Sequence, residues 1–411
     1  MRPTVKAIRS VARLIGIVAA AALKAARALL CGDREAAAMH VRVLTLALLD
    51  DASQALVRAQ RTFFGPLRPD EIDRILIVKL DRIGDMVTTT PVFDALRAKF
   101  PSARLDIVAH PAPLSLLADD ERIGQRIAYR SWLYHPLAIL PPGPRTWGLV
   151  LRLMWRRYPL VVCLRGSFSF LPLGLVSRMT ATKFIEGEPV IRRYLRSIEE
   201  LLGPLSDPPP RLRVSAENRR FAAELFAGGE ADGPRVAIHA TASSQAKMWP
   251  AERFSALADA LRDEHGAAVH FLGAPSDRGA LDAIARHARH EHAYHMSLSL
   301  PQVAAVIEAA DAFIGNDSGL AHIAAAVGTR MAVIWGAPNL SMARPRADEQ
   351  TCTILYHDLP CRQGCPEFRC NNPNRLECLL RTEVLDVFGA VSELLARGAE
   401  ATEKEACSRP T

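Results

Sequence analysis

The sequence predicts an α/β protein with two parallel-sheet domains of similar size that face each other across a cleft. Three observations lead to this prediction. Strand-like apolar runs alternate with helix-like segments from about residue 72 onward. A proline-rich stretch near residues 203–210 interrupts this alternation, which then starts again. The 411 residues, 49% hydrophobic and 23% charged, suit two or three globular domains.

The first half of the chain contains three strand-like runs and one clear helix. The runs "RILIVKL", "ARLDIVAH" and "YPLVVCLRG" are short, apolar and rich in β-branched residues. The segment "TPVFDALRAKF" has helical spacing, and Pro91 is compatible with the first turn of that helix. Residues 134–150 show no regular pattern, so we assign them no element.

The second half repeats the alternation more regularly. Its strand-like runs are "PRVAIHA", "AAVHFLGAP", "AFIGN" and "RMAVIWGAP", and its helical segments are "PAERFSALADALRDEH", "SDRGALDAIARHA" and "GLAHIAAAV". Two such halves joined by one linker indicate a pair of Rossmann-like domains. Ligands of these folds bind at the carboxyl ends of the strands, so the cleft is the predicted ligand site.

Residues 1–70 form a basic, alanine-rich extension that differs from the rest of the chain. Its apolar core, "LIGIVAAAAL", stops at Lys24 and is too short for a membrane-spanning helix. A signal peptide lacks support because no clean small-residue cleavage site follows. Two interpretations stay open: an amphipathic helix lying on a membrane surface, and a helix packed on the body of the protein.

The net charge of +7 and the pI of about 9.1 indicate an anionic partner. An anionic membrane surface and phosphorylated substrates both fit. Nucleic acid ranks below them because no basic stripe interleaved with aromatic residues is present.

Eight cysteines are present, and four of them crowd into residues 361–378. This is not the pattern of a secreted disulfide scaffold, so we expect a reducing compartment. The cluster lacks the C-x-x-C knuckle of most thiolate zinc sites. Free thiols, a structural metal site and disulfides all remain open for its members: Cys361, Cys365, Cys370 and Cys378.

Neither the dinucleotide-binding fingerprint nor the P-loop motif occurs in the sequence. The predicted chemistry instead rests on three polar stretches. The first is "NDSGLAHIAAAVG", where a strand ends and a helix begins. Free N–H groups at Ser318 and Gly319 would favour a phosphate or diphosphate, and His322 lies one turn further on. The alternative is that Asp317 or Ser318 only caps the helix and that His322 packs in the core.

The second stretch is the loop "HATASSQAKMWP", which also lies between a strand and a helix. Lys247 is its single cation and could neutralise a departing phosphate. The alternative is a solvated lysine without a specific role. Two anion-friendly loops at the strand ends of one domain favour the first interpretation.

The third stretch is "KLDRIGDMVTTTP", which follows the first strand of the other domain. Asp81 and Asp85 are both expected in the turn, where an acid would face the cleft and could remove a proton from a hydroxyl. Gly84 would permit a tight turn, and the three threonines that follow could cap the next helix. Each acid could instead serve only the turn.

Four blocks of sequence, in order, resemble the family 9 glycosyltransferases, which are the ADP-heptose:lipopolysaccharide heptosyltransferases and their relatives. The blocks are "RIGDMVTTTPVFDALRAKFP", "IHATASSQAKMWPAERFSALADAL", "FLGAPSD" and "FIGNDSGLAHIAAAVGTRMAVIWGAPN". The resemblance covers roughly residues 74–385. Cysteine-rich segments similar to residues 361–378 also occur in part of this family.

The resemblance implies a GT-B fold and an inverting transfer of a sugar from a nucleotide diphosphate, without a metal or other cofactor. Asp85, directly after Gly84, matches the general base, which leaves Asp81 to the turn. Lys247 matches the lysine that stabilises the leaving diphosphate. Gly84 and Thr88 belong to the matching acceptor-side loop. The donor-binding positions are Thr241, Lys247, Asp317, Ser318, Gly319 and His322. Two departures leave the donor open: the loop "SSQA" before Lys247, and Pro275 where one subgroup carries an acid that contacts the donor ribose.

The predicted domains are the extension 1–70, an acceptor-side domain 72–205, a nucleotide-sugar domain 211–385, and a C-terminal helix and tail 386–411. We expect a cytoplasmic enzyme, peripheral on the inner face of the membrane, that transfers heptose from ADP-heptose to a lipopolysaccharide-type glycolipid or oligosaccharide. Two alternatives are transfer of another nucleotide sugar and a non-catalytic nucleotide-sugar or glycolipid-binding protein. A binding protein has no need of Asp85.

Overall fold

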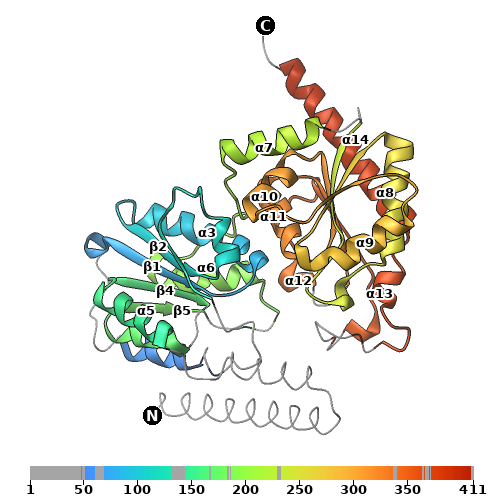
Figure 1. Cartoon of the computed structure of the whole chain (residues 1–411). Helices are drawn as coiled ribbons and strands as arrows, with labels where there is room; N and C mark the ends of the chain where they lie inside the picture. Colours follow the sequence, from blue (N-terminus) through green and yellow to red (C-terminus); the bar gives the residue numbers. More distant parts are fainter. Residues whose placement is uncertain are drawn as a thin grey trace. The chain divides into compact units, whose positions relative to one another are not determined.

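The computed structural model of the protein describes residues 48, 51–60, 69–130, 144–165, 168–182, 185, 187–228, 233–336, 340–362, 365, 370 and 372–408. The chain forms two compact units (Figure 1). The first contains residues up to Asp81, Val92–Leu114 and Glu121–Asp207. The second contains Arg82–Pro91, Ser115–Asp120 and Pro208–Thr411.

The first unit is built on a five-stranded parallel sheet in the order β3-β2-β1-β4-β5. The strands β1 and β4 carry uninterrupted apolar runs because both faces of the sheet are covered. Its strands are β1 (Arg74–Lys79), β2 (Arg104–Ala109), β3 (Ile123–Ala128), β4 (Leu160–Arg165) and β5 (Arg178–Ala181). Its helical segments are η1 (Pro69–Glu71), α4 (Pro111–Ser115), α5 (Pro144–Trp155), η3 (Phe168–Leu175) and α6 (Val190–Leu202).

Helix α3 (Ile83–Lys99) begins seven residues before the predicted helix, and its first half groups with the second unit. Pro91 therefore lies inside the helix and not in its first turn. A proline cannot donate to the carbonyl four residues earlier, which here belongs to Val87. The Thr90 hydroxyl donates to that carbonyl at 2.9 Å and replaces the missing bond. This local repair explains why the helix continues through Pro91.

The second unit has a six-stranded parallel sheet in the order β11-β10-β9-β6-β7-β8. Helices α7, α10 and α11 pack on one face, and α8 and α14 pack on the other (Figure 1). Its strands are β6 (Arg235–His239), β7 (Ala268–Leu272), β8 (Ala293–His295), β9 (Ala312–Asn316), β10 (Met331–Trp335) and β11 (Cys352–Tyr356). Its helical segments are α7 (Ala216–Ala227), η4 (Gln245–Lys247), α8 (Ala251–His265), η5 (Pro275–Asp277), α9 (Arg278–His287), α10 (Leu300–Ala309), α11 (Gly319–Val327), α12 (Leu340–Ala343), η6 (Pro360–Arg362), α13 (Glu377–Leu380) and α14 (Val384–Ser408).

The two sheets confirm the prediction of two parallel-sheet α/β domains. Each sheet also has a point where the strand order reverses, between β1 and β4 in the first and between β6 and β9 in the second. Loops that leave the carboxyl ends of strands at such a point form a crevice that commonly binds ligands.

Most of the N-terminal extension, including the segment on which the membrane-helix interpretation rests, lies outside the described residues. Residues 51–60 are helical and dock on the first unit. The Gln54 amide donates to the carbonyls of Ala181 and Thr182, at 3.0 and 3.1 Å, and Met179 N donates to Gln60 Oε1 at 2.8 Å. Among the described helices, none is long and apolar enough to cross a membrane.

Candidate functional site

The candidate site lies in the second unit, where β6 and β9 run side by side and end at the same edge of the sheet. Asn316, the last residue of β9, is fully buried and joins the two loops that follow these strands. Its amide nitrogen donates to Ala240 O at 2.8 Å, and its amide oxygen accepts from Trp249 N at 3.0 Å. The loops "HATASSQAKMWP" and "NDSG" are therefore held together at the reversal point.

Lys247, at the end of η4, is buried and ion-paired. Its ammonium lies 2.8 Å from Asp317 Oδ2, and the two side chains are 7% and 8% exposed. The solvated-lysine alternative is therefore wrong. Because an isolated buried charge is costly, Asp317 holds Lys247 in place at the start of helix α11.

Ser318 is the N-cap residue of α11, but its side chain makes no capping hydrogen bond to the helix. Its hydroxyl instead lies 3.0 Å from Nδ1 of His239. The interpretation of Ser318 as a simple side-chain cap is therefore wrong. Because the first N–H groups of a helix have no partner within it, the α11 N-terminus favours an anion.

His239, the last residue of β6, joins the two loops through side chains. Its Nε2 lies 3.1 Å from the Thr241 hydroxyl, while its Nδ1 meets Ser318. Burial lowers the pKa of His239 to about 4, and the nearby Asp277 charge opposes this only in part. The ring is neutral near pH 7, with one donor and one acceptor nitrogen, so it links both hydroxyls in one hydrogen-bonded chain.

Two glycines allow helices α3 and α11 to meet at their N-termini within the second unit. A Cβ atom on Gly84 would lie 2.8 Å from Cδ2 of His322. One on Gly319 would lie 3.0 Å from Cβ of Ile83 and 3.3 Å from Gly84 N. A Cβ atom at either position would press on its neighbours, so glycine lets the two helices approach this closely.

Asp85 lies in the first turn of α3 and not in the preceding turn, and it is half-buried. Burial lowers the pKa of His322, and the charges of Asp317 and Asp85 oppose that shift. The negative charges of both carboxylates therefore act on the His322 ring. The structure brings it together with Gly84, Asp85, Lys247, Asp317 and Gly319.

The three threonines after Asp85 lie inside α3 and do not cap it. The hydroxyls of Thr88 and Thr89 each donate at 2.8 Å to the carbonyl four residues earlier. The predicted loop positions of Gly84 and Thr88 are therefore wrong, because the helix begins at Ile83 and contains both.

The reversal point of the first unit holds a second polar cluster. Lys79, the last residue of β1, is fully buried, with its ammonium 2.6 Å from Asp81 Oδ2 and 3.8 Å from the centre of the Tyr194 ring. The Tyr194 hydroxyl also donates to Asp81 Oδ2, at 3.2 Å. Asp81 lies in the turn as predicted, but its carboxylate holds these two side chains.

Sequence reasoning missed Lys79, Tyr194, His239 and Asn316. Three of the four share one signal, a polar residue at the last position of an apolar strand: Lys79, His239 and Asn316. Tyr194 lies within helix α6, far along the chain, and carried no such signal.

No disulfide joins the described cysteines of the cluster 361–378. Asn372 Nδ2 donates to Cys361 Sγ at 3.2 Å, and Leu376 N donates to Cys370 Sγ at 3.1 Å. Burial raises the pKa of the Cys365 and Cys378 thiols. Within the described part of the chain, no three His, Cys, Asp or Glu side chains are grouped to hold a metal ion.

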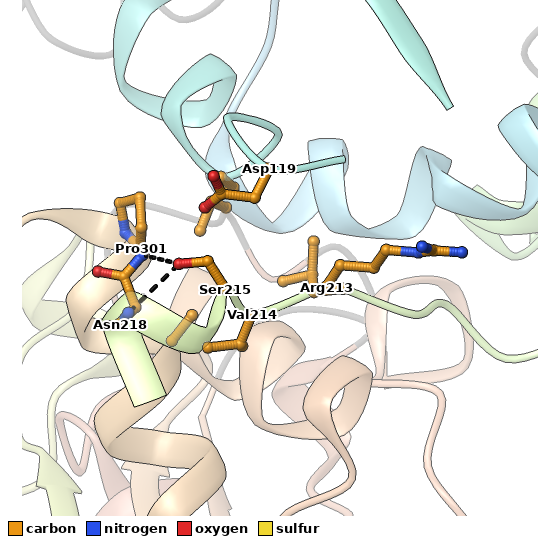
Figure 2. Close-up of a pocket in the computed structure, with 9 residues that line it drawn as sticks. Asp119, Arg213, Val214, Ser215, Asn218 and Pro301 are labelled. Atoms are coloured by element: carbon orange, nitrogen blue, oxygen red, sulfur yellow. Dashed lines mark hydrogen bonds between the residues drawn. The ribbon is translucent and has the colours of Figure 1, made fainter. Parts of the chain in front are cut away.

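A cavity of about 10 Å³ in the second unit is lined by other residues (Figure 2). Its lining includes Ser215, whose hydroxyl caps helix α7 by accepting from Asn218 N at 3.3 Å. The cavity has about the space of one water molecule and contains none of the predicted site residues.

Known proteins resemble this chain in sequence and in fold. The family model described as glycosyltransferase family 9 (heptosyltransferase) matches residues 158–370. Lipopolysaccharide heptosyltransferase 3 of Escherichia coli K12 is 27% identical over 348 residues, covering 79% of this chain and 98% of the relative. Lipopolysaccharide heptosyltransferase 2 of the same strain is 26% identical over 297 residues, covering 64% and 82%.

Solved structures share the fold. A family 9 glycosyltransferase from Veillonella parvula has a TM-score of 0.66 at 18% identity, covering 80% of this chain and 98% of its own. ADP-heptose lipopolysaccharide heptosyltransferase II of E. coli has a TM-score of 0.64 at 20% identity, covering 79% and 99%. These likenesses support the GT-B fold.

Proposed function

The chain belongs to glycosyltransferase family 9, whose model matches more than half of it, and we propose that it transfers heptose from ADP-heptose to a lipopolysaccharide-type saccharide. The observation that carries this proposal is the junction of Lys247, Asp317 and the α11 N-terminus at the reversal point of the second sheet. Relatives named lipopolysaccharide heptosyltransferases, matched over nearly their full length, support heptose as the transferred sugar and lipopolysaccharide as the acceptor. The solved ADP-heptose lipopolysaccharide heptosyltransferase II supports ADP-heptose as the donor. The donor is a substrate, and the proposed reaction uses no cofactor.

In the proposed mechanism, Asp85 accepts the proton of the acceptor hydroxyl while that oxygen attacks the anomeric carbon of the donor. The bond between this carbon and the diphosphate breaks in the same step, so the configuration inverts and ADP leaves. The half-buried position of Asp85 supports this role, because the carboxylate keeps access to solvent and to substrate. Its neighbour Gly84 also supports the role, because a Cβ atom there would lie 2.8 Å from Cδ2 of His322, so this end of α3 packs against a proposed donor-site residue.

The leaving diphosphate gains negative charge as the bond breaks, and two positive groups would stabilise it. One is the Lys247 ammonium, and the other is the N-terminus of α11 at Ser318 and Gly319. We propose that Thr241, held by His239, and His322 complete the donor site. A lysine and a helix dipole can supply this charge without a metal ion, which supports a metal-independent reaction.

A second donor remains a candidate because of two features of the loops. The segment "SSQA" before Lys247 and Pro275 at the start of η5 both depart from the heptosyltransferase pattern. Asp277 is engaged within its own turn, where it accepts from Ala274 N at 2.7 Å. A transferase of the same fold could therefore take another nucleotide sugar.

Donor binding by calorimetry separates these candidates, with ADP-heptose, a GDP-sugar and a UDP-sugar titrated side by side. We expect saturable binding of ADP-heptose alone. Saturable binding of a UDP-sugar without ADP-heptose binding would overturn the proposed donor.

We further propose that the reaction takes place in the cytoplasm, at the inner face of the membrane, where a lipid-linked acceptor is presented.

A further inference from the structure

Helix α5 of the first unit carries an exposed apolar stripe that the proposed chemistry does not use. Trp147, Leu151 and Trp155 follow each other at intervals of four residues, so they lie on one side of the helix. Their exposed fractions are 41%, 61% and 87%. The opposite side, with Thr146, Val150 and Leu153, is buried against the unit. The stripe therefore is not part of the core.

Basic side chains border this stripe. Arg145 and Arg152 are exposed and lie on the adjoining face, about 60–120° around the helix from Leu151 and Trp155 at 100° per residue. Arg157 just beyond the helix is also exposed, and residues 144–158 contain no acid. The positive charge of this face is therefore not balanced by its own helix.

The neighbouring segment η3 packs on α5 and ends in more exposed apolar surface. Leu175 is 69% exposed, and Val176, the next residue, is 38% exposed. Soluble proteins rarely expose large apolar side chains in groups, and such groups mark interaction sites. We call the exposed side chains of α5, of the end of η3 and of the residue after it the α5 surface: Arg145, Trp147, Leu151, Arg152, Trp155, Leu175 and Val176.

We propose that the α5 surface docks the enzyme on an anionic lipid membrane. Tryptophan prefers the boundary between water and lipid, because its ring is apolar and its N–H is polar. Arginines beside it attract anionic headgroups. An apolar stripe edged by basic residues is the pattern of a helix that lies in the membrane plane. The inference rests on the proposed function in one respect: a lipid-linked acceptor gives the docking its purpose.

Vesicle flotation of the full-length protein tests the surface. The vesicles are phosphatidylcholine with and without phosphatidylglycerol, and the variant is Trp147→Ser/Leu151→Ser/Trp155→Ser. We expect partitioning to anionic vesicles to weaken by roughly tenfold or more. The control is Leu385→Ser, because Leu385 is an apolar residue on α14 of the second unit with 79% of its surface exposed. This variant should bind vesicles as the parent does. Arg145→Gln/Arg152→Gln should weaken binding by about fivefold per arginine and reduce its dependence on phosphatidylglycerol.

Tryptophan fluorescence identifies which segment meets the lipid. The chain has five tryptophans; Trp249 and Trp335 are buried, and residues 1–70 contain none. Trp132, outside the described residues, is replaced by Phe in every protein tested. Brominated lipids should then quench the emission of Trp147 and Trp155. Absence of quenching despite vesicle binding would overturn the proposal and assign binding to another segment.

Two other outcomes would also overturn it. The first is a triple variant that floats as well as the parent. The second is a parent that ignores vesicles but self-associates through this surface, seen as a concentration-dependent dimer that the triple variant loses. Transfer to a lipid-free oligosaccharide acceptor distinguishes the membrane-docking proposal from the proposed sugar transfer. The triple variant should transfer sugar to this acceptor as the parent does. A parent that does not transfer sugar to it would count against the proposed function alone.

Discussion

Replacement of Lys247 by Met should both destabilise the second unit and abolish sugar transfer. Met has nearly the length of Lys and removes only the charge. The variant leaves the Asp317 carboxylate in a site where it is 8% exposed and has lost the ammonium 2.8 Å away. A buried carboxylate without its partner is the main source of the expected destabilisation.

The size of this effect follows from the burial of the pair. Removing one partner of a buried ion pair costs about 3–5 kcal/mol. For a domain of this size, each kcal/mol lowers the unfolding midpoint by about 2–4 °C, so a fall on the order of 6–20 °C is expected. Lys99→Met is the matched control, because Lys99 is exposed at the end of α3 and should change the midpoint little.

Calorimetric unfolding and a transfer assay separate the effect on stability from the effect on catalysis. Both are also applied to the double variant Lys247→Met/Asp317→Asn. Its second substitution removes the uncompensated carboxylate, so stability should recover in large part. Transfer should stay lost, because no cation remains beside the leaving diphosphate. Recovery of transfer in the double variant would refute the proposed role of Lys247. A single variant as stable as Lys99→Met would refute the ion-pair argument.

Two further predictions concern the buried rings. Gly84→Ala puts a Cβ atom 2.8 Å from Cδ2 of His322. Kinetics should show a sharp fall in kcat, and circular dichroism should show a loss of stability of about 1–3 kcal/mol. An unaffected kcat would contradict the close contact. Burial holds the pKa of His239 and His270 at about 4, below the ordinary 6.5, so the unfolded state takes up protons first as the pH falls. The free energy of unfolding should therefore drop by about 1 kcal/mol per histidine between about pH 7 and 5.5, and a pH-independent value by denaturant titration would contradict this.

The strand pattern of the fold could be predicted because buried parallel strands leave plain apolar runs. The runs "RILIVKL", "AFIGN" and "RMAVIWGAP" correspond to β1, β9 and β10. Shorter or more polar strands gave no such signal, and β3, with Gln125 and Arg126 in its centre, was missed. The start of α3 was missed because a proline normally marks a first turn, whereas the Thr90 hydroxyl satisfies the carbonyl that Pro91 leaves open.

The candidate site could be predicted to the level of its loops, because helix N-termini after strands are visible in the sequence. The partners within it could not. The sequence does not reveal that Lys247 meets Asp317, seventy residues later, since that pairing depends on β6 and β9 being neighbours in the sheet. The same holds for His239 and Ser318.

In the proposed mechanism, Asp85 removes the proton of the acceptor hydroxyl during transfer from a nucleotide sugar. The most direct measurement compares Asp85→Asn with Asp94→Asn, an exposed acid on the same helix whose side chain is 55% exposed. Transfer by Asp85→Asn should fall by about 10²–10⁴-fold while calorimetric donor affinity stays at the parent value, and Asp94→Asn should match the parent in both. Transfer by Asp85→Asn within a few-fold of the parent would exclude Asp85 as the base.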